Sequence, residues 1–131
     1  TTDFVFIDTE ANKLIAYYAL SCSSIMISSD SDTINLVPAV EISIFSLAKE
    51  YQGIIMYEDE DYNLSTYIMD KVVEKIFKFT EEQCGARVIV LYSVPKAYNF
   101  YDNYGFSDFV ELMKPAASKT LEDCIPMFFN L

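Results

Sequence analysis

Apolar runs separated by short polar segments open the chain, and they predict β-strands. One run covers residues 3–8 and a second covers residues 13–22, with the polar turn 9–12 between them. Two such runs joined by a short polar segment are typical of a β-hairpin. A third extended run, at residues 39–47, follows a polar stretch at residues 28–32. We therefore expect three consecutive antiparallel strands at the start of the chain.

The pattern changes to helical spacing between Asn63 and Gly85. Apolar residues recur there every three or four positions on one stripe, with further apolar residues beside it. The stripe consists of Leu64, Ile68, Val72, Ile76 and Phe79, and Met69, Val73 and Phe77 lie beside it. Asn63 is suited to cap the start of a helix, and Gly85 is suited to end one in a left-handed conformation. The spacing predicts a long helix over about residues 64–84.

Residues 87–93 are apolar almost throughout, which predicts a strand that is covered on both faces. A strand that follows a long helix completes a β-α-β crossover, so residues 42–47 and 87–93 should lie side by side and parallel. Ser93 is expected to cap a second helix, at about residues 94–104, that ends at Gly105. The inward side of this helix would carry Ala97, Phe100, Tyr101 and Tyr104.

Two further strands are predicted near the end of the chain, at residues 106–113 and 125–131, with a loop at residues 115–118 between them. A chain of 131 residues has the usual size of one domain, and no internal repeat or boundary interrupts it. We expect a single domain over residues 1–131, of the α/β (α+β) class. Its sheet should be mixed and mostly antiparallel, with a central parallel pair and two main helices.

Histidine is absent from the chain, which excludes Ser-His-Asp and Cys-His nucleophile systems and any zinc site built on histidine. The cysteines are Cys22, Cys84 and Cys124, an odd number at wide spacing, which fits neither a disulfide framework nor a metal clamp. We expect them to be reduced core residues of a cytoplasmic protein that binds no metal. No signal-peptide pattern and no long apolar run is present, so we predict neither secretion nor a membrane span.

The net charge of −11 bears on the choice of partner. Such an acidic surface repels phosphate backbones unless its cations gather on one face, and the nine lysines and arginines are spread along the chain. Lys71, Lys75 and Lys78 do share a helical face, but nearby acids favour a solvated stripe over a nucleic-acid site. We therefore expect no nucleic acid as partner.

Three segments resemble the GNAT family of N-acetyltransferases. Residues 97–106 (AYNFYDNYGF) resemble the family's alanine, Phe-Tyr and Gly-Phe block, and this block is moderately specific. Residues 42–53 resemble the strand that runs into the cofactor loop, and residues 126–131 resemble the closing strand. The resemblance covers nearly the whole chain from the family's second strand onward, whereas the family's first strand and helices have no counterpart. It implies a GNAT-like fold and transfer of an acetyl group from acetyl-CoA to a primary amine of a small molecule or protein.

The same resemblance assigns the cofactor-binding residues and exposes a departure among them. It places Gln52 and Gly53 in the loop for the pyrophosphate, the backbone of Phe45, Ser46 and Leu47 along the pantetheine arm, and Tyr101 beside the thioester. Ile55 and Tyr57 stand where the family has glycines, and a side chain there obstructs close approach. The acids at residues 58–61 would also repel a phosphate. We expect weakened CoA binding, and the alternative function is an inactive GNAT-fold binding or regulatory module.

Two residues are candidates for catalysis. Tyr101 matches the tyrosine that often serves as general acid in the family, and the alternative is an aromatic core residue of an amphipathic helix. Glu41 interrupts an apolar strand and is the candidate base, directly or through water, and the alternative is a solvent-facing strand position. The exposed edge of the first hairpin could also pair with a second copy of the chain, giving a homodimer, or with another partner.

Overall fold

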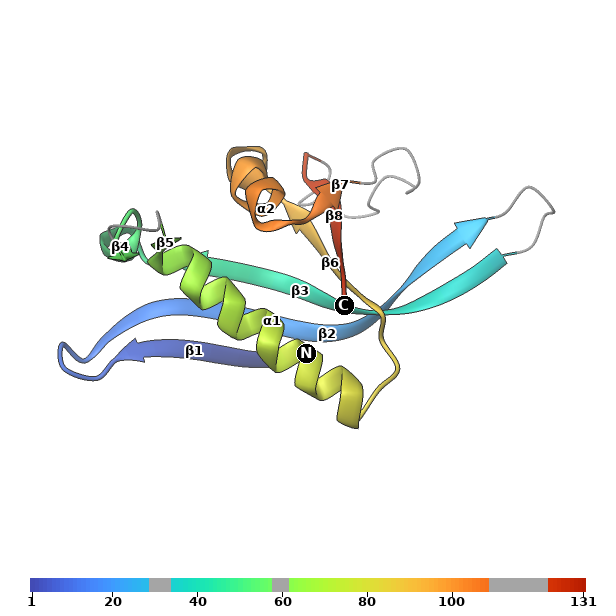
Figure 1. Cartoon of the computed structure of the whole chain (residues 1–131), viewed down its shortest axis with the longest axis horizontal. Coiled ribbons are helices and arrows are strands. Elements are labelled where there is room, and N and C mark those ends of the chain that lie inside the picture. Colours follow the sequence, from blue (N-terminus) through green and yellow to red (C-terminus); the bar gives the residue numbers. More distant parts are fainter. Residues whose placement is uncertain (29–33, 58–61, 109–122) are drawn as a thin grey trace. The chain divides into compact units, whose positions relative to one another are not determined.

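The computed structural model describes residues 1–28, 34–57, 62–108 and 123–131, which form a mixed α+β fold (Figure 1). Six strands make one sheet in the order β1-β2-β3-β6-β8-β7, and β4 and β5 pair in a second, two-stranded sheet. The chain divides into two compact units, unit 1 (residues 1–21 and 42–84) and unit 2 (residues 22–41 and 85–131). The prediction of one domain stays a prediction.

The strands of the large sheet are β1 (Thr2–Asp8), β2 (Lys13–Ser28), β3 (Ile34–Leu47), β6 (Val88–Ser93), β8 (Ile125–Asn130) and β7 (Ser107–Asp108). The small sheet consists of β4 (Ile55–Tyr57) and β5 (Tyr62–Asn63). The helices are α1 (Leu64–Glu82) and α2 (Tyr98–Tyr104), with 3-10 turns at Lys49–Tyr51 and Pro95–Ala97. The predicted fold class, mostly antiparallel with one parallel pair and two helices, is confirmed.

The predicted hairpin at the start of unit 1 is confirmed. Strands β1 and β2 pair antiparallel, from Thr2 opposite Leu20 to Asp8 opposite Lys13. The carboxylate of Asp8 accepts hydrogen bonds from the backbone N–H groups of Glu10 (3.1 Å) and Ala11 (3.2 Å), which closes the turn. β1 has one strand neighbour in the sheet, so the edge required for the predicted homodimer is present, and the dimer itself stays a prediction.

Strand β3 runs antiparallel to β2 within unit 1. The backbone N–H of Ala48 donates to the carbonyl of Ile15 (2.8 Å), and the hydroxyls of Ser21 and Ser43 lie 3.2 Å apart. Residue numbers thus rise along β2 as they fall along β3, which is antiparallel pairing. The predicted three consecutive antiparallel strands are confirmed, although β2 and β3 extend further toward residues 29–33 than expected.

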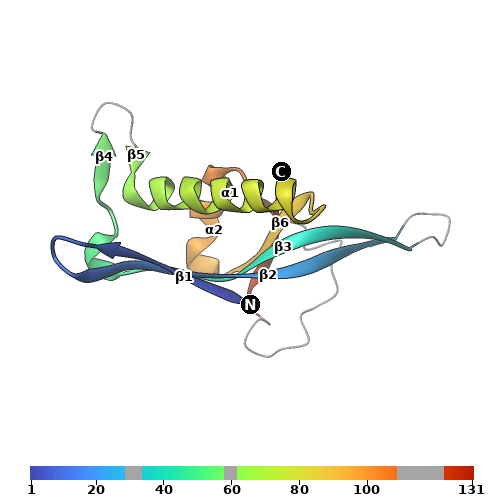
Figure 2. The same ribbon diagram turned by 90° about the horizontal axis from the view of Figure 1, so that it is seen from below.

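Helix α1 lies along one face of the β1–β2 hairpin in unit 1 (Figure 2). Its side chains Ile68, Met69, Val72 and Ile76 are buried, as the helical spacing predicts. Lys75 is exposed, and its ammonium group lies 3.9 Å from the centre of the Phe4 ring, which is a cation–π contact between the helix and the hairpin.

The C-terminal part of α1 differs from the prediction in two respects. Phe77 and Phe79 are 45% and 43% exposed, so the buried stripe ends at Ile76. Gly85 does not adopt a left-handed conformation, and the prediction that it caps the helix is wrong. The helix ends two residues earlier, at Gln83, whose N–H donates to the carbonyl of Phe79 (2.8 Å). A glycine signals a cap only when the last turn reaches it, and here the chain has already left the helix.

The parallel pair, β3 with β6, is confirmed, with its start earlier on β3 than predicted. Within unit 2 the backbone N–H of Arg87 donates to the carbonyl of Pro38 (3.0 Å). Ala39 packs against Val88 and Val90 in a buried cluster. We expected residues 42–47 to be the neighbour of residues 87–93, and this contact lies earlier on β3, at Pro38. A proline lacks only the N–H, and its carbonyl accepts a strand hydrogen bond normally. Whether residues 42–47 flank β6 stays a prediction.

The second helix and the last strands complete unit 2. β8 pairs antiparallel with β6, from Val88 opposite Asn130 to Ser93 opposite Ile125, and β7 pairs with β8. The predicted cap at Ser93 is wrong, because its hydroxyl donates to the carbonyl of Val94 (2.9 Å), and the chain passes through a 3-10 turn before α2. The predicted strand 106–113 is confirmed at residues 107 and 108, and residues 109–113 and the loop 115–118 lie outside the described residues.

None of the three cysteines forms a disulfide, as predicted, but none of them is a core residue. Cys22 is exposed, and Cys84 and Cys124 are half-buried. Cys22 lies on a strand and Cys84 just beyond a helix end, where neighbouring elements cover only part of each side chain. In the described parts of the chain, no helix has both the length and the apolar character needed to cross a membrane.

Candidate active site

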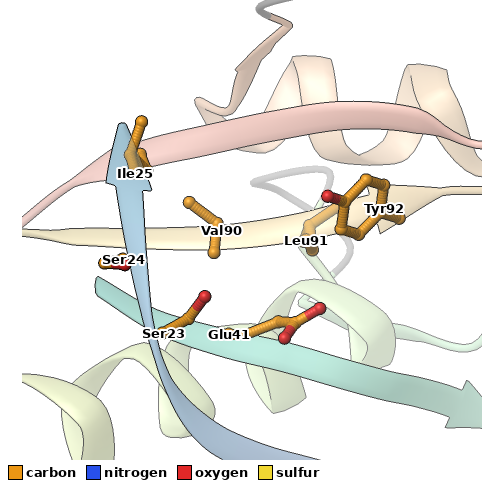
Figure 3. A pocket seen from close by; sticks show the side chains of 7 residues that line it. All are labelled: Ser23, Ser24, Ile25, Glu41, Val90, Leu91 and Tyr92. Atoms are coloured by element: carbon orange, nitrogen blue, oxygen red, sulfur yellow. The ribbon is translucent and has the colours of Figure 1, made fainter. Parts of the chain in front are cut away.

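A pocket of about 80 Å³ lies in unit 2, where β2, β3 and β6 approach one another (Figure 3). Its lining comprises Ser23, Ser24 and Ile25 from β2, Glu41 from β3, and Val90, Leu91 and Tyr92 from β6. One carboxylate, one phenol and two hydroxyls thus share a small space with three apolar side chains, and the lining contains no cation. Such a pocket favours a group that is positively charged at one end and apolar at the other.

Glu41, the predicted base, belongs to this pocket and is half-buried. Tyr92 lines the same pocket, and burial together with the negative charge of Glu41 raises the pKa of the Tyr92 phenol. The role of Glu41 as a base stays a prediction, and so does the alternative of a solvent-facing strand position. Sequence reasoning missed Ser23, Ser24 and Tyr92, although a tyrosine interrupting the apolar run 87–93 is a signal of the same kind as Glu41.

Tyr101, the predicted general acid, lies on α2 and is 7% exposed. Its ring makes edge contacts with Phe100 (centroids 5.3 Å apart) and Phe106 (5.7 Å). Burial raises the pKa of Tyr101 to about 12, because the apolar surroundings disfavour a phenolate. The phenol is therefore protonated at neutral pH, and it is better suited to donate a hydrogen bond than to give up its proton.

The raised pKa of Tyr101 predicts a loss of stability at alkaline pH. In the unfolded chain this phenol titrates near 10, whereas in the folded protein it titrates near 12. Above pH 10 the unfolded chain releases a proton that the folded chain keeps, so the free energy of unfolding should fall until about pH 12, by roughly 3 kcal/mol at most. Urea unfolding at pH 8, 10 and 11.5 measures this decline.

Tyr101→Phe is the matched variant for this measurement, since it keeps the ring and removes the titrating group. It should show a shallower decline than the wild type between pH 10 and 12. Tyr62, whose pKa a hydrogen bond to Asp70 raises to about 12, contributes equally to both proteins. Equal slopes in the two proteins would contradict the burial of an unionised Tyr101.

The residues assigned to the cofactor belong to unit 1 and follow the end of β3. Phe45 and Leu47 are half-buried, and Ser46 is exposed. The side-chain amide of Gln52 donates to the carbonyl of Leu47 (2.9 Å), so Gln52 is directed back toward the strand end. Gly53 has a φ of +78°, a conformation that disfavours a side chain. Of the predicted cofactor-binding residues, Gln52 and Leu47 are thus brought together by a hydrogen bond.

Ile55 and Tyr57, which replace the family's glycines, lie in a strand rather than in a loop. They form β4, in which Ile55 is opposite Asn63 and Tyr57 is opposite Tyr62 of β5 (Figure 2). Both side chains are 57% exposed. The expectation of a loop through this segment is corrected at residues 55–57 and 62–63, because β-branched and aromatic side chains favour extended pairing. The acidic run at residues 58–61 lies outside the described residues.

The N-terminus of α1 is closed by groups of the chain itself. The side-chain carbonyl of Asn63 accepts hydrogen bonds from the N–H of Thr66 (3.0 Å), the hydroxyl of Thr66 (2.8 Å) and the hydroxyl of Ser65 (2.7 Å). The N–H of Leu64 donates to the carbonyl of Ile54 (2.8 Å). Helix N-termini bind phosphate through unpaired N–H groups, and these two are paired. Two of the N–H groups that a pyrophosphate could use at this helix end are therefore already hydrogen-bonded within the chain.

Across the described ranges, no cluster of three or more cysteine, aspartate or glutamate residues is placed to hold a metal ion. The predicted site residues thus fall into two sets. Glu41 joins a pocket in unit 2, and Tyr101 is buried in an aromatic cluster of the same unit. The cofactor-binding candidates belong to unit 1 and lie within nine residues of sequence, at 45–47 and 52–53.

Comparison with known proteins gives matches in structure only. No protein-family model matches the sequence, and no curated protein matches it. A structure described as a bacterial toxin matches with a TM-score of 0.67 and 18% identity, over 95% of this chain and 64% of its own. AtaT complexed with acetyl-methionyl-tRNAfMet matches with a TM-score of 0.63 and 16% identity, over 98% of this chain and 69% of its own. The NatC complex bound to Gag peptide and CoA matches with a TM-score of 0.59 and 15% identity, over 98% of this chain and 70% of its own.

These matches show that the chain has the fold of GNAT acetyltransferases, as the sequence resemblance implied. The chain spans less than two thirds of the length of the first two matching structures, 64% and 59%. At identities below 20%, likeness establishes the fold, and activity has to be argued from the residues of this chain.

Proposed function

We propose that the chain is a GNAT-type N-acetyltransferase that acetylates a primary amine. The observation that carries the proposal is the pocket in unit 2, which the half-buried carboxylate of Glu41 lines together with Tyr92, a phenol whose pKa is raised by burial and by the charge of Glu41. An amine acceptor arrives as an ammonium ion, and it must lose a proton before its nitrogen can attack. Glu41 is the one group among the pocket residues that can attract the ammonium and accept that proton, directly or through water.

The size and lining of the pocket define what part of the acceptor it holds. About 80 Å³ is room for the ammonium group and its adjoining carbons rather than for a whole metabolite. The carbons would lie against Ile25, Val90 and Leu91, and the ammonium would lie against Glu41 with the hydroxyls of Ser23 and Tyr92 as further acceptors of its hydrogen bonds. Either a small amine or a protein amine can present such a group.

The donor implied by this proposal is acetyl-CoA, whose thioester supplies an activated acetyl carbon to which the amine nitrogen bonds as the carbon–sulfur bond breaks. Tyr101 is proposed as the hydrogen-bond donor to the departing sulfur. A phenol with a pKa near 12 stabilises negative charge on sulfur by donation, while the proton that the sulfur finally takes up can come from solvent. The backbone of residues 45–47 is proposed to lie along the pantetheine arm.

The chain's charge favours a cationic acceptor over a nucleic acid. AtaT, one of the structural matches, is complexed with an acetylated aminoacyl-tRNA. A net charge of −11 repels tRNA phosphates and attracts ammonium groups. We therefore propose an amine metabolite or a protein amine as acceptor.

One observation favours a second function, a GNAT-fold binding or regulatory module without catalysis. The helix end that would receive the pyrophosphate is capped by Asn63, and the neighbouring segment is the strand β4. A protein that has lost its donor would retain the fold and the amine pocket. It would then bind an amine without acetylating it.

Release of free thiol from acetyl-CoA in the presence of alkylamines distinguishes the two functions. We expect turnover in the wild type and a decrease of about 10- to 100-fold in kcat for Tyr101→Phe, since one hydrogen bond to developing charge is lost. Tyr104→Phe, on the same helix, is the control and should stay near the wild-type rate. An absence of turnover in wild type that binds amine would support the binding module instead.

A further inference from the structure

We infer that the acyl donor is recognised through its thioester and pantetheine arm, and that the diphosphate of coenzyme A adds little to binding. The donor class is then a pantetheine thioester, with or without a nucleotide. This inference rests on the proposed acetyltransferase function and concerns only the donor side of it. All the residues that carry it belong to unit 1.

The first ground is the use of the hydrogen-bond donors at the start of α1. Thr66 gives its N–H and its hydroxyl to Asn63, Ser65 gives its hydroxyl to the same oxygen, and Leu64 gives its N–H to Ile54. A diphosphate would have to displace these partners. Each displaced bond would have to be replaced by one of equal strength, so the helix end offers a phosphate little net gain.

The second ground is the surface beside this helix end. Ile54, Ile55, Met56 and Tyr57 are between 39% and 57% exposed, so four successive side chains present carbon to solvent. Residues 55 and 57 also carry a Cβ that glycine lacks, which obstructs the approach of an anion to the β4 backbone on the face where these side chains lie. An exposed apolar strand suits an alkyl or pantetheine chain and does not compensate the charge of a phosphate.

The third ground is the charge of the same segment of sequence. Residues 48–67 contain five acids (Glu50, Glu58, Asp59, Glu60 and Asp61) and one lysine, Lys49, which gives a net charge of −4. The family's binding mode needs a positive potential here, and this segment supplies a negative one.

What remains for a donor is the strand end itself. Residues 45–47 end β3, with Ser46 exposed, and Gln52 folds back onto the carbonyl of Leu47. The amide groups of a pantetheine arm can pair with strand backbone, and that pairing requires no particular side chain. Loss of the phosphate cradle therefore removes one part of donor recognition and leaves the other intact.

Calorimetric titration of the whole chain with coenzyme A and with pantetheine, which lacks the diphosphate and nucleotide, tests the inference without relying on turnover. We expect dissociation constants within about threefold of each other. We also expect the affinity for coenzyme A to stay nearly constant between about 50 mM and about 200 mM salt. An affinity for coenzyme A more than about thirtyfold above that for pantetheine, and lost with salt, would overturn the inference.

Asn63→Gly tests the cause, because glycine is a tolerated N-cap that frees the N–H and hydroxyl of Thr66. Its preference for coenzyme A over pantetheine should rise, whereas Asn130→Gly, at the exposed end of β8, should leave the ratio unchanged. An unchanged ratio of the two affinities in Asn63→Gly would show that the Asn63 cap is not what prevents the diphosphate from binding.

Thiol release from acetyl-CoA and from S-acetyl-pantetheine separates the inference from the proposed function. Comparable kcat/KM for both donors supports both statements, and a strong preference for acetyl-CoA refutes the inference alone. Equal binding of the two ligands without any turnover supports the donor mode and refutes catalysis. An absence of binding by either ligand at millimolar concentration refutes both.

Discussion

Replacing Glu41 by glutamine is expected to lower kcat/KM for amine acetylation by about 10²- to 10⁴-fold, the range that general bases contribute. The substitution keeps the size and one carbonyl of the side chain, and it removes the charge that attracts the ammonium and the site that accepts its proton. Thiol release measured at saturating donor separates the two effects, because weaker amine binding raises KM and loss of the base lowers kcat.

A readout independent of turnover accompanies this variant. The charge of Glu41 contributes to the raised pKa of Tyr92, so Glu41→Gln should lower the pKa of that phenol, which ultraviolet titration can follow. Glu82→Gln, at the exposed end of α1, is the control and should change neither kcat/KM nor the pKa of Tyr92. Wild-type turnover in Glu41→Gln would exclude it as the base, and an unmoved Tyr92 would show that the two groups do not share the pocket.

The largest effect on stability is expected for Phe106→Ala. Phe106 is 1% exposed and lies at the centre of the aromatic cluster of unit 2. Its ring centroid is 5.7 Å from that of Tyr101, 6.1 Å from that of Tyr104 and 5.2 Å from that of Phe129. Removing it should lower the free energy of unfolding by about 3–5 kcal/mol, since the transfer energy is lost and a cavity remains.

Phe79→Ala makes the same chemical change at a site that is 43% exposed. It should cost less than about 1 kcal/mol in urea unfolding, because little buried surface is lost and alanine favours the helix. If both variants unfold with the same midpoint, the aromatic cluster does not stabilise the fold as its burial implies. Phe106→Leu retains much of the volume and should fall between the two.

Sequence and structure each contribute to the proposal on donor recognition. Ile55, Tyr57 and the acids at 58–61 predict a poor phosphate loop from sequence alone. The structure adds that residues 55–57 pair as a strand and that Asn63 holds the helix end with three accepted hydrogen bonds. A loop with unsuitable residues could still rearrange around a ligand, whereas a capped helix end has to break bonds first.

The sequence by itself determined the elements and their order. Helical spacing predicts Ile68, Val72 and Ile76 as the buried stripe of α1, and the apolar run predicts β6 as an inner strand, because these patterns depend on local geometry alone. Gly105 was likewise identifiable as the end of α2, where it has a φ of +129°.

Only the tertiary structure decided which residues share a site. Ser23, Glu41 and Tyr92 come from three strands, and the register between those strands, which no local pattern specifies, places them around one pocket. A long-range contact also decided where the pairing of β3 begins, because the carbonyl of Pro38 accepts a hydrogen bond from the N–H of Arg87. The end of α1 is local, since the N–H of Gln83 donates to Phe79 before Gly85 is reached. Local preference sets where an element can form, and the partners available in the fold set where it stops.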